Sequence, residues 1–348
     1  MNVLLIGGSS RMIDAVIDKL NKGKHRIFLL TGRRDRQFSY KHVFERYDYP
    51  YEDESVKDIF ESVKPDMVVF MGAYDTNFDW HRERQESVRY TASLMNILST
   101  YSMACKGRFV YLSSHEVFGG SYHNDIAESE TTTPRGFKAL AISQGEEICE
   151  NYRKTQGVDT MSLRFDHLYG VPRRGQEDSN PCFQMCLEAL KTGKVSASDR
   201  RSFSMLYLND AVELAYKAMT EEQPALSCYH ITSGEELDEV KLAGMVIKAM
   251  GGGIRLVNNS VGDKYRLLLD GRSFQEEYDQ KIFVQYEEGV EQVVKYMKRH
   301  ADAFISAEDL GGSTLGRIWH GIKVAFKRIF PFVENLICFV PFFLLNSK

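Results

Sequence analysis

The sequence of 348 residues predicts an α/β fold, a doubly wound parallel sheet followed by a small C-terminal α/β lobe. Two observations lead to this prediction. Short runs that are apolar on both faces, as in buried parallel strands, alternate with longer segments in which apolar residues recur at helical spacing. The first run, residues 2–8, leads through a glycine turn directly into a helix. Since crossovers between parallel strands are right-handed, this alternation also limits the topology.

Each element is predicted from its own stretch of sequence. Strands are expected at the short, continuous apolar runs, which are residues 2–8, 25–32, 65–73, 107–114, 158–170 and 228–234. Helices are expected where apolar residues recur every three or four positions, at residues 11–23, 54–64, 85–105, 139–155, 181–194, 209–220, 236–252 and 286–300.

The chain is expected to have three parts. Residues 1–300 form the α/β domain, with the parallel-sheet core at about 1–170 and the smaller lobe mainly at 171–300. A Gly-Gly-Ser stretch indicates a linker over residues 301–314. Residues 315–348 form an amphipathic and hydrophobic tail.

Composition argues against two classes of partner. The net charge is −4, and the arginine pairs are short and scattered, so we expect no nucleic-acid binding. The six cysteines contain no C-x-x-C pair, and no histidine or second cysteine pair completes a zinc set. We therefore expect no metal site.

The turn after the first strand, "GGSSRMI" (7–13), is related to the glycine turn of dinucleotide-binding folds. There, glycines in a G-x-x-G-x-x-G pattern let the backbone approach a pyrophosphate at the helix N-terminus. Only Gly7 keeps the pattern, because Ser10 and Ile13 add side chains at the other two positions. The second strand ends "LLTGRR", with no acidic residue for ribose hydroxyls, whereas Arg33 or Arg34 would suit a 2′-phosphate. We expect no nicotinamide cofactor, and NADP before NAD if one binds.

Six segments together resemble a known family: "LLIGGSS", "PDMVVFMGA", "FVYLSSHEVFGG", "PRGFKALAISQGEE", "LRFDHLYGVP" and "YHITSGEELDEVKLAGMVIKAMG". They are similar to extended short-chain dehydrogenases/reductases of the NAD-dependent epimerase/dehydratase kind, which act on nucleotide sugars. The resemblance covers roughly residues 1–300. It implies a Rossmann-like fold in which the smaller lobe binds the substrate.

The resemblance also implies a catalytic tetrad of serine or threonine, a tyrosine and a lysine four residues apart, and asparagine. Ser114 matches the serine, and Arg89 takes the asparagine position. The tyrosine and lysine positions fall on Leu140 and Gln144 in "LAISQGEE". Leucine cannot exchange a proton, and glutamine has no charge with which to lower a pKa. Losing a positioned acid/base costs on the order of 10²–10⁴ in rate, so these residues indicate a vestigial site.

Other residues of the implied site have changed as well. His115 and Glu116 align with the Asp-Glu pair that sugar dehydratases of this family use, and an atypical site built on them is the alternative to a vestigial one. His167 stands where the family has asparagine. Arg200 and Arg201 lie slightly early for the arginine that binds the sugar-nucleotide diphosphate.

The tail suggests a membrane. "LGRIWHGIKVAFKRI" (315–329) is basic and amphipathic, and it is followed by the apolar run "IFPFVENLICFVPFFLL" (329–345), interrupted by Pro331, Glu334 and Pro341. Basic residues before the run place the domain in the cytoplasm, tethered to the inner face of the cell membrane. The alternative is a hydrophobic helix packed on the domain.

Together these observations favour a catalytically inactive domain that acts as a dimerisation or scaffold module. A degenerate domain joined to a membrane segment resembles the N-terminal part of Pel-type bacterial polysaccharide-secretion membrane proteins, which implies a role in exopolysaccharide biosynthesis. Two alternatives stay open: an active nucleotide-sugar epimerase, dehydratase or reductase, and a sensor that binds without turnover. The resemblance further implies a homodimer packed through helices at about 85–105 and 139–155.

Overall fold

The computed structural model describes residues 1–32, 40–173, 175–176, 178–260, 262–279 and 284–305. These residues divide into two compact units. The first unit contains Met1–Tyr169, Arg200–Glu239 and the described part of Val261–Gln285. The second contains Gly170–Asp199, Val240–Ser260 and the described residues from Tyr286 onward. Two segments of the expected smaller lobe therefore return to the first unit.

The first unit is built on a seven-stranded sheet with the order β11-β6-β5-β4-β1-β2-β3. The strands are β1 (Asn2–Ile6), β2 (Arg26–Leu30), β3 (Val43–Tyr47), β4 (Met67–Phe70), β5 (Arg108–Ser114), β6 (Asp159–Phe165) and β11 (Cys228–Ile231). All neighbouring pairs are parallel. The expected doubly wound parallel sheet is confirmed.

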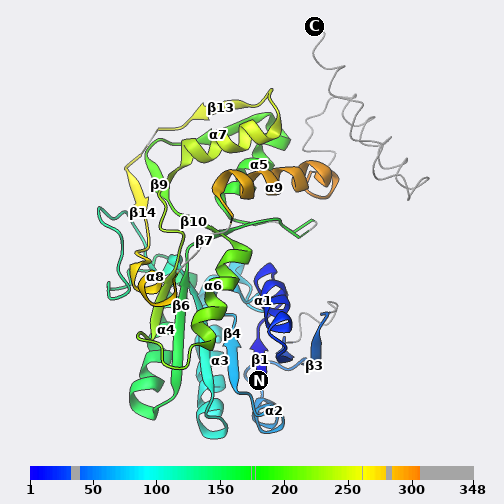
Figure 1. The fold of residues 1–348 in the computed structure, drawn as a ribbon, viewed down its shortest axis with the longest axis vertical. Coiled ribbons are helices and arrows are strands. Elements are labelled where there is room, and N and C mark those ends of the chain that lie inside the picture. The colour runs from blue at the N-terminus through cyan, green and yellow to red at the C-terminus, as the bar shows by residue number, and fades with distance from the viewer. Residues whose placement is uncertain (33–39, 174, 177, 261, 280–283, 306–348) are drawn as a thin grey trace, which may run out of the picture. The chain divides into compact units, whose positions relative to one another are not determined.

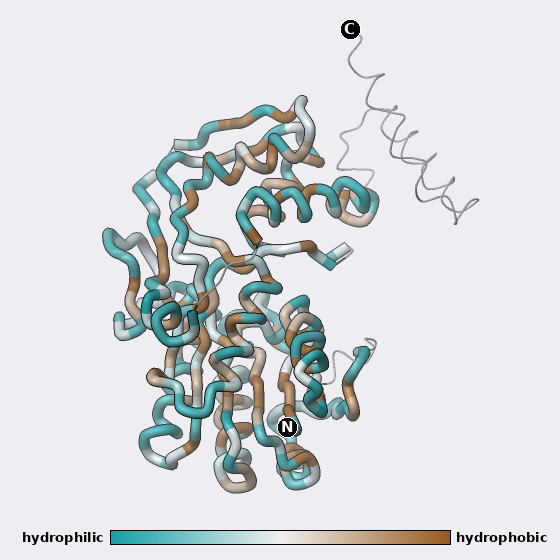
Figure 2. Tube along the Cα trace, in the orientation of Figure 1, coloured by the Kyte–Doolittle hydropathy of each residue, from teal (hydrophilic) through white to brown (hydrophobic). Residues whose placement is uncertain are grey.

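Helices cover both faces of this sheet (Figure 1). On one face, α1 (Arg11–Lys22) and α6 (Leu208–Thr220) pack together over a core that includes Leu5 and Val69. On the other face lie α2 (Ser55–Val63), α3 (Glu83–Ala104) and α4 (Phe137–Gln156). The strands between them are buried on both sides, which is why their sequences are continuous apolar runs. Figure 2 shows these runs along β1 and β4.

Short elements complete the first unit. They are the strands β7 (His167–Tyr169), β9 (Arg201–Phe203), β10 (Met205–Tyr207), β12 (Leu237–Asp238) and β14 (Tyr265–Leu267), and the helix α8 (Arg272–Tyr278). β10 pairs with β7, and β9 lies between β12 and β14. Strands of two or three residues carry no periodicity, so the sequence patterns did not predict them.

The second unit contains three α-helices among its described residues: α5 (Pro181–Thr192), α7 (Glu239–Met250) and α9 (Tyr286–Arg299). In this unit β8 (Lys194–Ala197) pairs in parallel with β13 (Arg255–Asn258), and α5 packs against α9. Phe183 of α5 meets Phe304 edge to face, with ring centroids 5.7 Å apart. The start of the expected linker is therefore packed on this unit.

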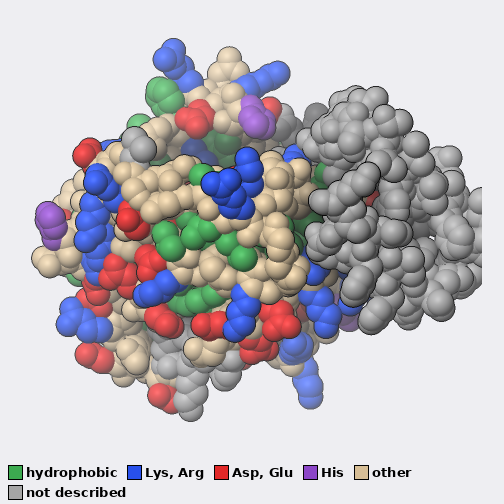
Figure 3. Space-filling model, turned by 90° about the horizontal axis from the view of Figure 1, so that it is seen from above, with side chains coloured by type: hydrophobic (Ala, Val, Ile, Leu, Met, Phe, Trp, Pro, Cys, Tyr) green, Lys and Arg blue, Asp and Glu red, His purple; other side chains and the backbone are tan. Residues whose placement is uncertain are grey.

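The surface and tail predictions have different outcomes. Lys, Arg, Asp and Glu side chains are interspersed over the described residues of the face shown in Figure 3. The absence of nucleic-acid binding stays a prediction. The expected membrane segment, 315–348, lies outside the described residues. Among those that the structure describes, no helix is long and apolar enough to cross a membrane.

Candidate functional site

The strand order reverses between β1 and β4, because the chain leaves β1 toward β2 on one side and returns at β4 on the other. In open parallel sheets, ligands bind in the crevice outside the carboxyl ends of the strands at such a switch point. Here the crevice is bordered by the glycine turn after β1 and by the loop after β4. Gly7 is needed at this approach, since a Cβ there would lie 2.2 Å from Cγ of Met71.

A carboxylate from the loop after β4 occupies the turn. Oδ1 of Asp75 accepts the backbone N–H of Gly8 at 2.7 Å, the N–H of Asn77 at 2.9 Å and the side-chain amide of Asn77 at 2.9 Å. Asp75 is 2% exposed. Burial raises the pKa of Asp75 to about 6, although the Asn77 and Gly8 N–H groups oppose that rise. At neutral pH the switch point therefore carries a negative charge from the protein itself.

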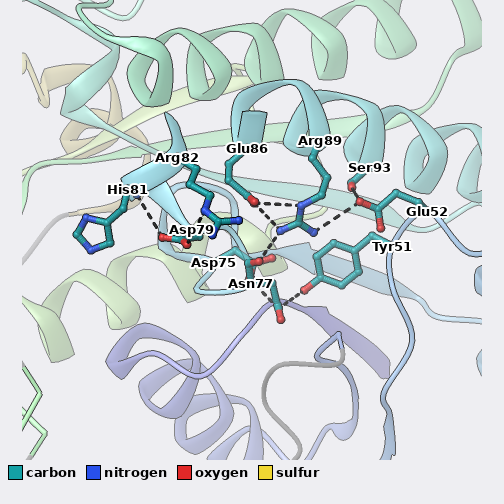
Figure 4. A network of polar contacts seen from close by, with 10 residues as sticks. All are labelled: Tyr51, Glu52, Asp75, Asn77, Asp79, His81, Arg82, Glu86, Arg89 and Ser93. Carbon is teal, nitrogen blue, oxygen red and sulfur yellow. Dashed lines mark hydrogen bonds and ion pairs between the residues drawn. The ribbon is translucent and has the colours of Figure 1, made fainter. Parts of the chain in front are cut away.

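The loop that carries Asp75 is held by Arg89 of α3 (Figure 4). The Arg89 guanidinium donates to the Asn77 carbonyl at 2.5 Å and to Oε2 of Glu86 at 2.6 Å, and it lies 3.6 Å from Oε1 of Glu52. The Asn77 amide also donates to the Tyr51 hydroxyl at 2.7 Å. The structure thus groups Arg89 with the Asp75 loop, and not with Ser114, where the sequence-based tetrad placed it.

Two of the other residues predicted for the cofactor site, Ser10 and Ile13, are described by the structure. Ser10 is the N-cap of α1, and its Oγ accepts the Ile13 N–H at 3.3 Å, so a protein side chain takes an amide of the helix N-terminus. Ile13 itself is fully buried. Arg33 lies outside the described residues. An acidic side chain does stand beside the end of β2, because Asp48, which follows β3, accepts from Thr31 Oγ1 at 2.8 Å.

A second polar cluster lies where β5 ends. Ser114 closes β5 and caps a short 3-10 helix, His115–Val117, by accepting the Glu116 N–H at 3.2 Å. Glu116 accepts a hydrogen bond from Nζ of Lys138, the second residue of α4, at 2.8 Å. Burial alone would raise the pKa of Glu116, but the ammonium group of Lys138 holds it below its usual value. The carboxylate is therefore ionised and paired.

His115 stacks on His167, the first residue of β7, with ring centroids 3.6 Å apart. Burial, together with His167, lowers the pKa of His115 to about 3, so this imidazole is neutral at physiological pH. His167 Nδ1 lies 3.2 Å from Oδ1 of Asp166. Asp166 is buried and also accepts hydrogen bonds from the Ser204 and Thr232 hydroxyls. The structure thus brings together His115, Glu116 and His167, which the sequence had singled out separately.

Helix α4 presents a different pair of residues to this cluster than the sequence suggested. Leu140 is 40% exposed, and Gln144 is exposed beside Thr91 of α3. Lys138 contacts Glu116, and Ile142, one turn later, is fully buried. The assignment of the vestigial pair therefore moves two residues toward the N-terminus, because the face of α4 that packs on the sheet begins at 138. In either register, the tyrosine–lysine pair is absent.

Beneath the cluster, α4 is fixed to the sheet by a buried ion pair. Glu146 accepts from Arg164 Nη2 at 2.7 Å and from Arg164 Nε at 2.9 Å, and the Ser113 hydroxyl also reaches it at 2.5 Å. Gly145 permits this close contact, since a Cβ there would lie 2.2 Å from the Tyr111 hydroxyl. The helix that would carry the catalytic pair is thus firmly positioned, although the pair is missing.

The two arginines suggested for a diphosphate both have protein partners. Arg200 donates to the Gly262 carbonyl at 2.6 Å, and Arg201 lies 3.7 Å from Oε1 of Glu239. Within the described ranges, no group of three or more His, Cys, Asp and Glu side chains is arranged to hold a metal ion.

Sequence reasoning missed two residues of the site, Asp75 and Lys138. Asp75 gave no signal in the sequence, because the short helix Gly72–Tyr74 separates it from β4 and its place at the glycine turn depends on β1 and β4 being neighbours. For Lys138, the signal was its spacing of eight residues, about two helical turns, from Glu146, a charged residue on the inner face.

Comparison with known proteins agrees with this architecture. The model of the "NAD dependent epimerase/dehydratase family" matches residues 3–231. The dTDP-glucose 4,6-dehydratase of Streptomyces niveus is 25% identical over 195 residues, 55% of this chain and 57% of that protein. The dTDP-D-glucose 4,6-dehydratase of Homo sapiens is 25% identical over 199 residues, 56% of this chain and 55% of that protein. The chain matches little more than half the length of these curated relatives.

Solved structures show the same fold. The UDP-glucose 4-epimerase of Thermus thermophilus, in complex with NAD, has a TM-score of 0.71 at 18% identity, covering 86% of this chain and 99% of that one. The dTDP-glucose 4,6-dehydratase of Bacillus anthracis, also in complex with NAD, has a TM-score of 0.72 at 14% identity, covering 87% and 98%. The family match spans well over half of the sequence, and the seven-stranded sheet has the corresponding form. The chain belongs to the NAD-dependent epimerase/dehydratase family.

Proposed function

We propose that this protein has lost the hydride-transfer chemistry of its family and acts as a binding or scaffold module. One observation carries the proposal: the inner face of α4 offers Lys138 and Ile142 where a tyrosine and a lysine four residues apart are needed. Ile142 has no charge with which to hold a ribose or lower the pKa of a phenol. Lys138 is already paired with Glu116.

A neighbouring phenol does not replace the missing tyrosine. Tyr74 ends the short helix after β4, Gly72–Tyr74. Burial, with the negative charges of Glu116 and Asp166, raises the pKa of Tyr74 well above its usual value. A general base must be deprotonated near the working pH, and Tyr74 is protonated there.

The cofactor of the family fits poorly at two places. The Asp75 carboxylate accepts the Gly8 N–H of the glycine turn. A diphosphate bound at this turn would bring two further negative charges close to that carboxylate. At the other end of the crevice, no ammonium group stands four residues after Lys138 for the nicotinamide ribose. Asp48 would suit an adenosine ribose, but Arg46 already donates to it at 2.7 Å. These observations support the proposal that the protein carries no nicotinamide cofactor.

Apolar side chains on α3 and α4 support a scaffold role. Val88 is 70% exposed and Met95 49% exposed on α3, and Thr91, which lies between them in the sequence, contacts Gln144 of α4. Leu140 extends this apolar set on α4. We propose that a second copy of the chain covers it, which would form a bundle of two helices from each subunit.

We further propose that residues 315–348 tether the domain to the inner face of a bacterial membrane, in a protein of exopolysaccharide biosynthesis. The support is the sequence alone: a basic amphipathic stretch that precedes a Phe- and Leu-rich run. Cell fractionation should recover the full chain with membranes and a chain ending at residue 310 in the soluble fraction. A full chain found in the soluble fraction would contradict the tether.

The decisive experiment is turnover by the purified full chain. We expect no product from dTDP-glucose or UDP-glucose with added NAD⁺ or NADP⁺, measured by chromatography, which separates a 4-epimer of equal mass, and by mass spectrometry for loss of water. The double variant Lys138→Tyr with Ile142→Lys, which restores the pair on the inner face, is the matched comparison. Turnover by the wild-type protein would sink the proposal.

A second candidate function, a sensor that binds a sugar nucleotide without turnover, is favoured by the strand-end cluster. Lys138, Glu116 and His167 keep polar groups that are partly open to solvent, with exposed side-chain fractions of 29%, 36% and 15%. Calorimetry with UDP-glucose and dTDP-glucose distinguishes the two functions. Binding without turnover would support the sensor, and no binding would support the scaffold.

A further inference from the structure

The Asp75 carboxylate is placed where the fold would otherwise receive a ligand. It comes from the loop after β4 and bonds the turn after β1, so it spans the two strands between which the sheet order reverses. Its two backbone partners, the N–H groups of Gly8 and Asn77, lie on opposite sides of that crevice. Both N–H groups donate to the same oxygen, Oδ1 of Asp75.

We propose that Asp75 determines the ligand specificity of the switch point: its carboxylate is a built-in anion that closes the glycine turn to dinucleotide diphosphates. This proposal depends on the contact of Asp75 with Gly8, whereas the proposed loss of hydride transfer depends on Lys138 and Ile142 of α4.

Three physical features support this assignment. The carboxylate is 2% exposed, so water screens its charge little. Arg89 donates hydrogen bonds to the Asn77 carbonyl and to Glu86 and forms an ion pair with Glu52 at 3.6 Å, so its charge is directed to groups other than Asp75. The Gly8 N–H is already satisfied, and a phosphate oxygen would have to displace a charged acceptor at 2.7 Å.

The loop is also rigid enough to hold the carboxylate in place. Asn77 bonds Asp75 with both its backbone and its side-chain amide, and its side-chain amide also bonds the Tyr51 hydroxyl. The Arg89 guanidinium stacks 4.4 Å from the ring centroid of Phe78, the residue after Asn77. Moving Asp75 out of the turn would break several of these contacts together.

The test is calorimetric titration of the full chain with NAD⁺ at low ionic strength. Three variants are compared with wild type: Asp75→Ser, which removes the charge and shortens the side chain; Asp75→Asn, which removes the charge but keeps an acceptor for Gly8; and Asp79→Asn. Asp79 is the matched control, because its carboxylate lies four residues along the same loop and accepts the His81 N–H at 3.3 Å. Thermal unfolding of each variant verifies that it is folded.

We expect Asp75→Ser to bind NAD⁺ at least about tenfold more tightly than wild type, Asp75→Asn to lie between them, and Asp79→Asn to match wild type. Any of three results would overturn the inference: tight NAD⁺ binding by wild type, no gain in the folded Asp75→Ser variant, or an equal gain in Asp79→Asn. Tight binding by wild type without turnover would remove this inference and leave the proposed loss of hydride transfer intact. The two ideas therefore fail separately.

Discussion

Two buried carboxylates of the first unit have opposite surroundings. Glu146, on the inner face of α4, is 7% exposed and meets the guanidinium of Arg164 at 2.7 Å. Asp75, at the switch point, is 2% exposed and accepts hydrogen bonds from neutral donors, among them the N–H groups of Gly8 and Asn77. Both charges are removed from water, but only the first meets an opposite charge.

This difference separates a structural charge from a functional one. A buried ion pair is stable when its geometry is good and its remaining lone pairs are bonded, as the Ser113 hydroxyl provides for Glu146. A buried carboxylate with neutral donors alone keeps part of its desolvation cost, which is why its pKa rises. Costs of this kind concentrate at functional sites, and the switch point is where this fold binds ligands.

The largest expected effect is on the stability of the fold, through the buried ion pair of Glu146 and Arg164. Glu146→Gln leaves the Arg164 guanidinium buried without its counter-charge, so we expect the free energy of unfolding to fall by about 3–5 kcal/mol. Urea denaturation followed by circular dichroism measures it. Glu116→Gln is the control, since its pair with Lys138 is partly exposed and should contribute less than about 1 kcal/mol. Equal losses in the two variants would remove the contrast between buried and rim charges.

The next effect belongs to Asp75 and depends on pH. Its folded pKa of about 6 exceeds the usual value of 3.8, so between these values the folded state binds a proton that the unfolded state does not. The free energy of unfolding should therefore rise as pH falls from 7 to 4, by about 2 kcal/mol from this group.

Other groups titrate over the same interval, so the measurement is the difference between wild type and Asp75→Asn. His115, for example, has a pKa lowered to about 3, chiefly by burial, and contributes in the opposite direction, losing stability as pH falls below 6.5. Denaturant midpoints of both proteins at several pH values give the difference curve. A flat curve between pH 4 and 7 would show that Asp75 is not desolvated.

The two carboxylates also mark what the sequence can and cannot predict. The parallel sheet followed from runs such as residues 2–8 and 107–114, because a strand buried on both faces is apolar at every position. β3 was missed, because its sequence "VFERY" belongs to a partly exposed edge strand without a clear apolar pattern. Asp75 was missed because its meaning depends on β1 and β4 being neighbours, which is a tertiary fact.

The register of α4 was missed for a related reason. A pair four residues apart fits a helix in several positions, and only the packing of Gly145 on Tyr111 fixes which face meets β5. The absence of tyrosine and lysine was visible from the sequence, whereas the residues that replace them, Lys138 and Ile142, were not. Asp75, whose carboxylate lies where we propose that a phosphate would otherwise bind, could likewise be identified only from the structure.

A smaller effect is expected on the association of two subunits, and it depends on which side chains of α3 are exposed. Leu98 lies on the helix predicted to form the dimer interface, residues 85–105, but it is fully buried in the core of its own subunit. The interface variant is therefore Val88→Glu with Met95→Glu, because both side chains are exposed. If two subunits pair there, each substitution counts twice, and we expect the dimer to dissociate at least about tenfold more readily.

Sedimentation of the full chain in mild detergent measures this change. Lys57→Glu is the control, since it places a new acidic charge on α2, where Lys57 is 64% exposed, and leaves the side chains of α3 and α4 unchanged. It should leave the association unchanged. A wild-type chain that sediments as a monomer at micromolar concentration would end the dimer proposal before any variant is made.

The smallest effect concerns the pair that replaces the catalytic residues. Lys138→Met keeps the length of the side chain and removes the charge beside Glu116, and both partners are partly exposed. The free energy of unfolding should therefore change by less than about 1 kcal/mol. The pKa of Glu116 should respond more clearly: Lys138 holds it down against burial, so without the ammonium group it should rise above its usual value. Carboxyl carbon chemical shifts, followed by NMR over a pH titration, report it.

The matched control is Lys154→Met, near the other end of the same helix. Lys154 pairs with Glu150 at 3.2 Å, but Arg153 also pairs with Glu150, at 2.7 Å, so the pKa of Glu150 should stay low when Lys154 loses its charge. The two titrations then distinguish a carboxylate that depends on one cation from a carboxylate that has two. If the Glu116 titration is as insensitive as that of Glu150, Lys138 does not control the charge at the end of β5, and the cluster has no acid/base partner on α4.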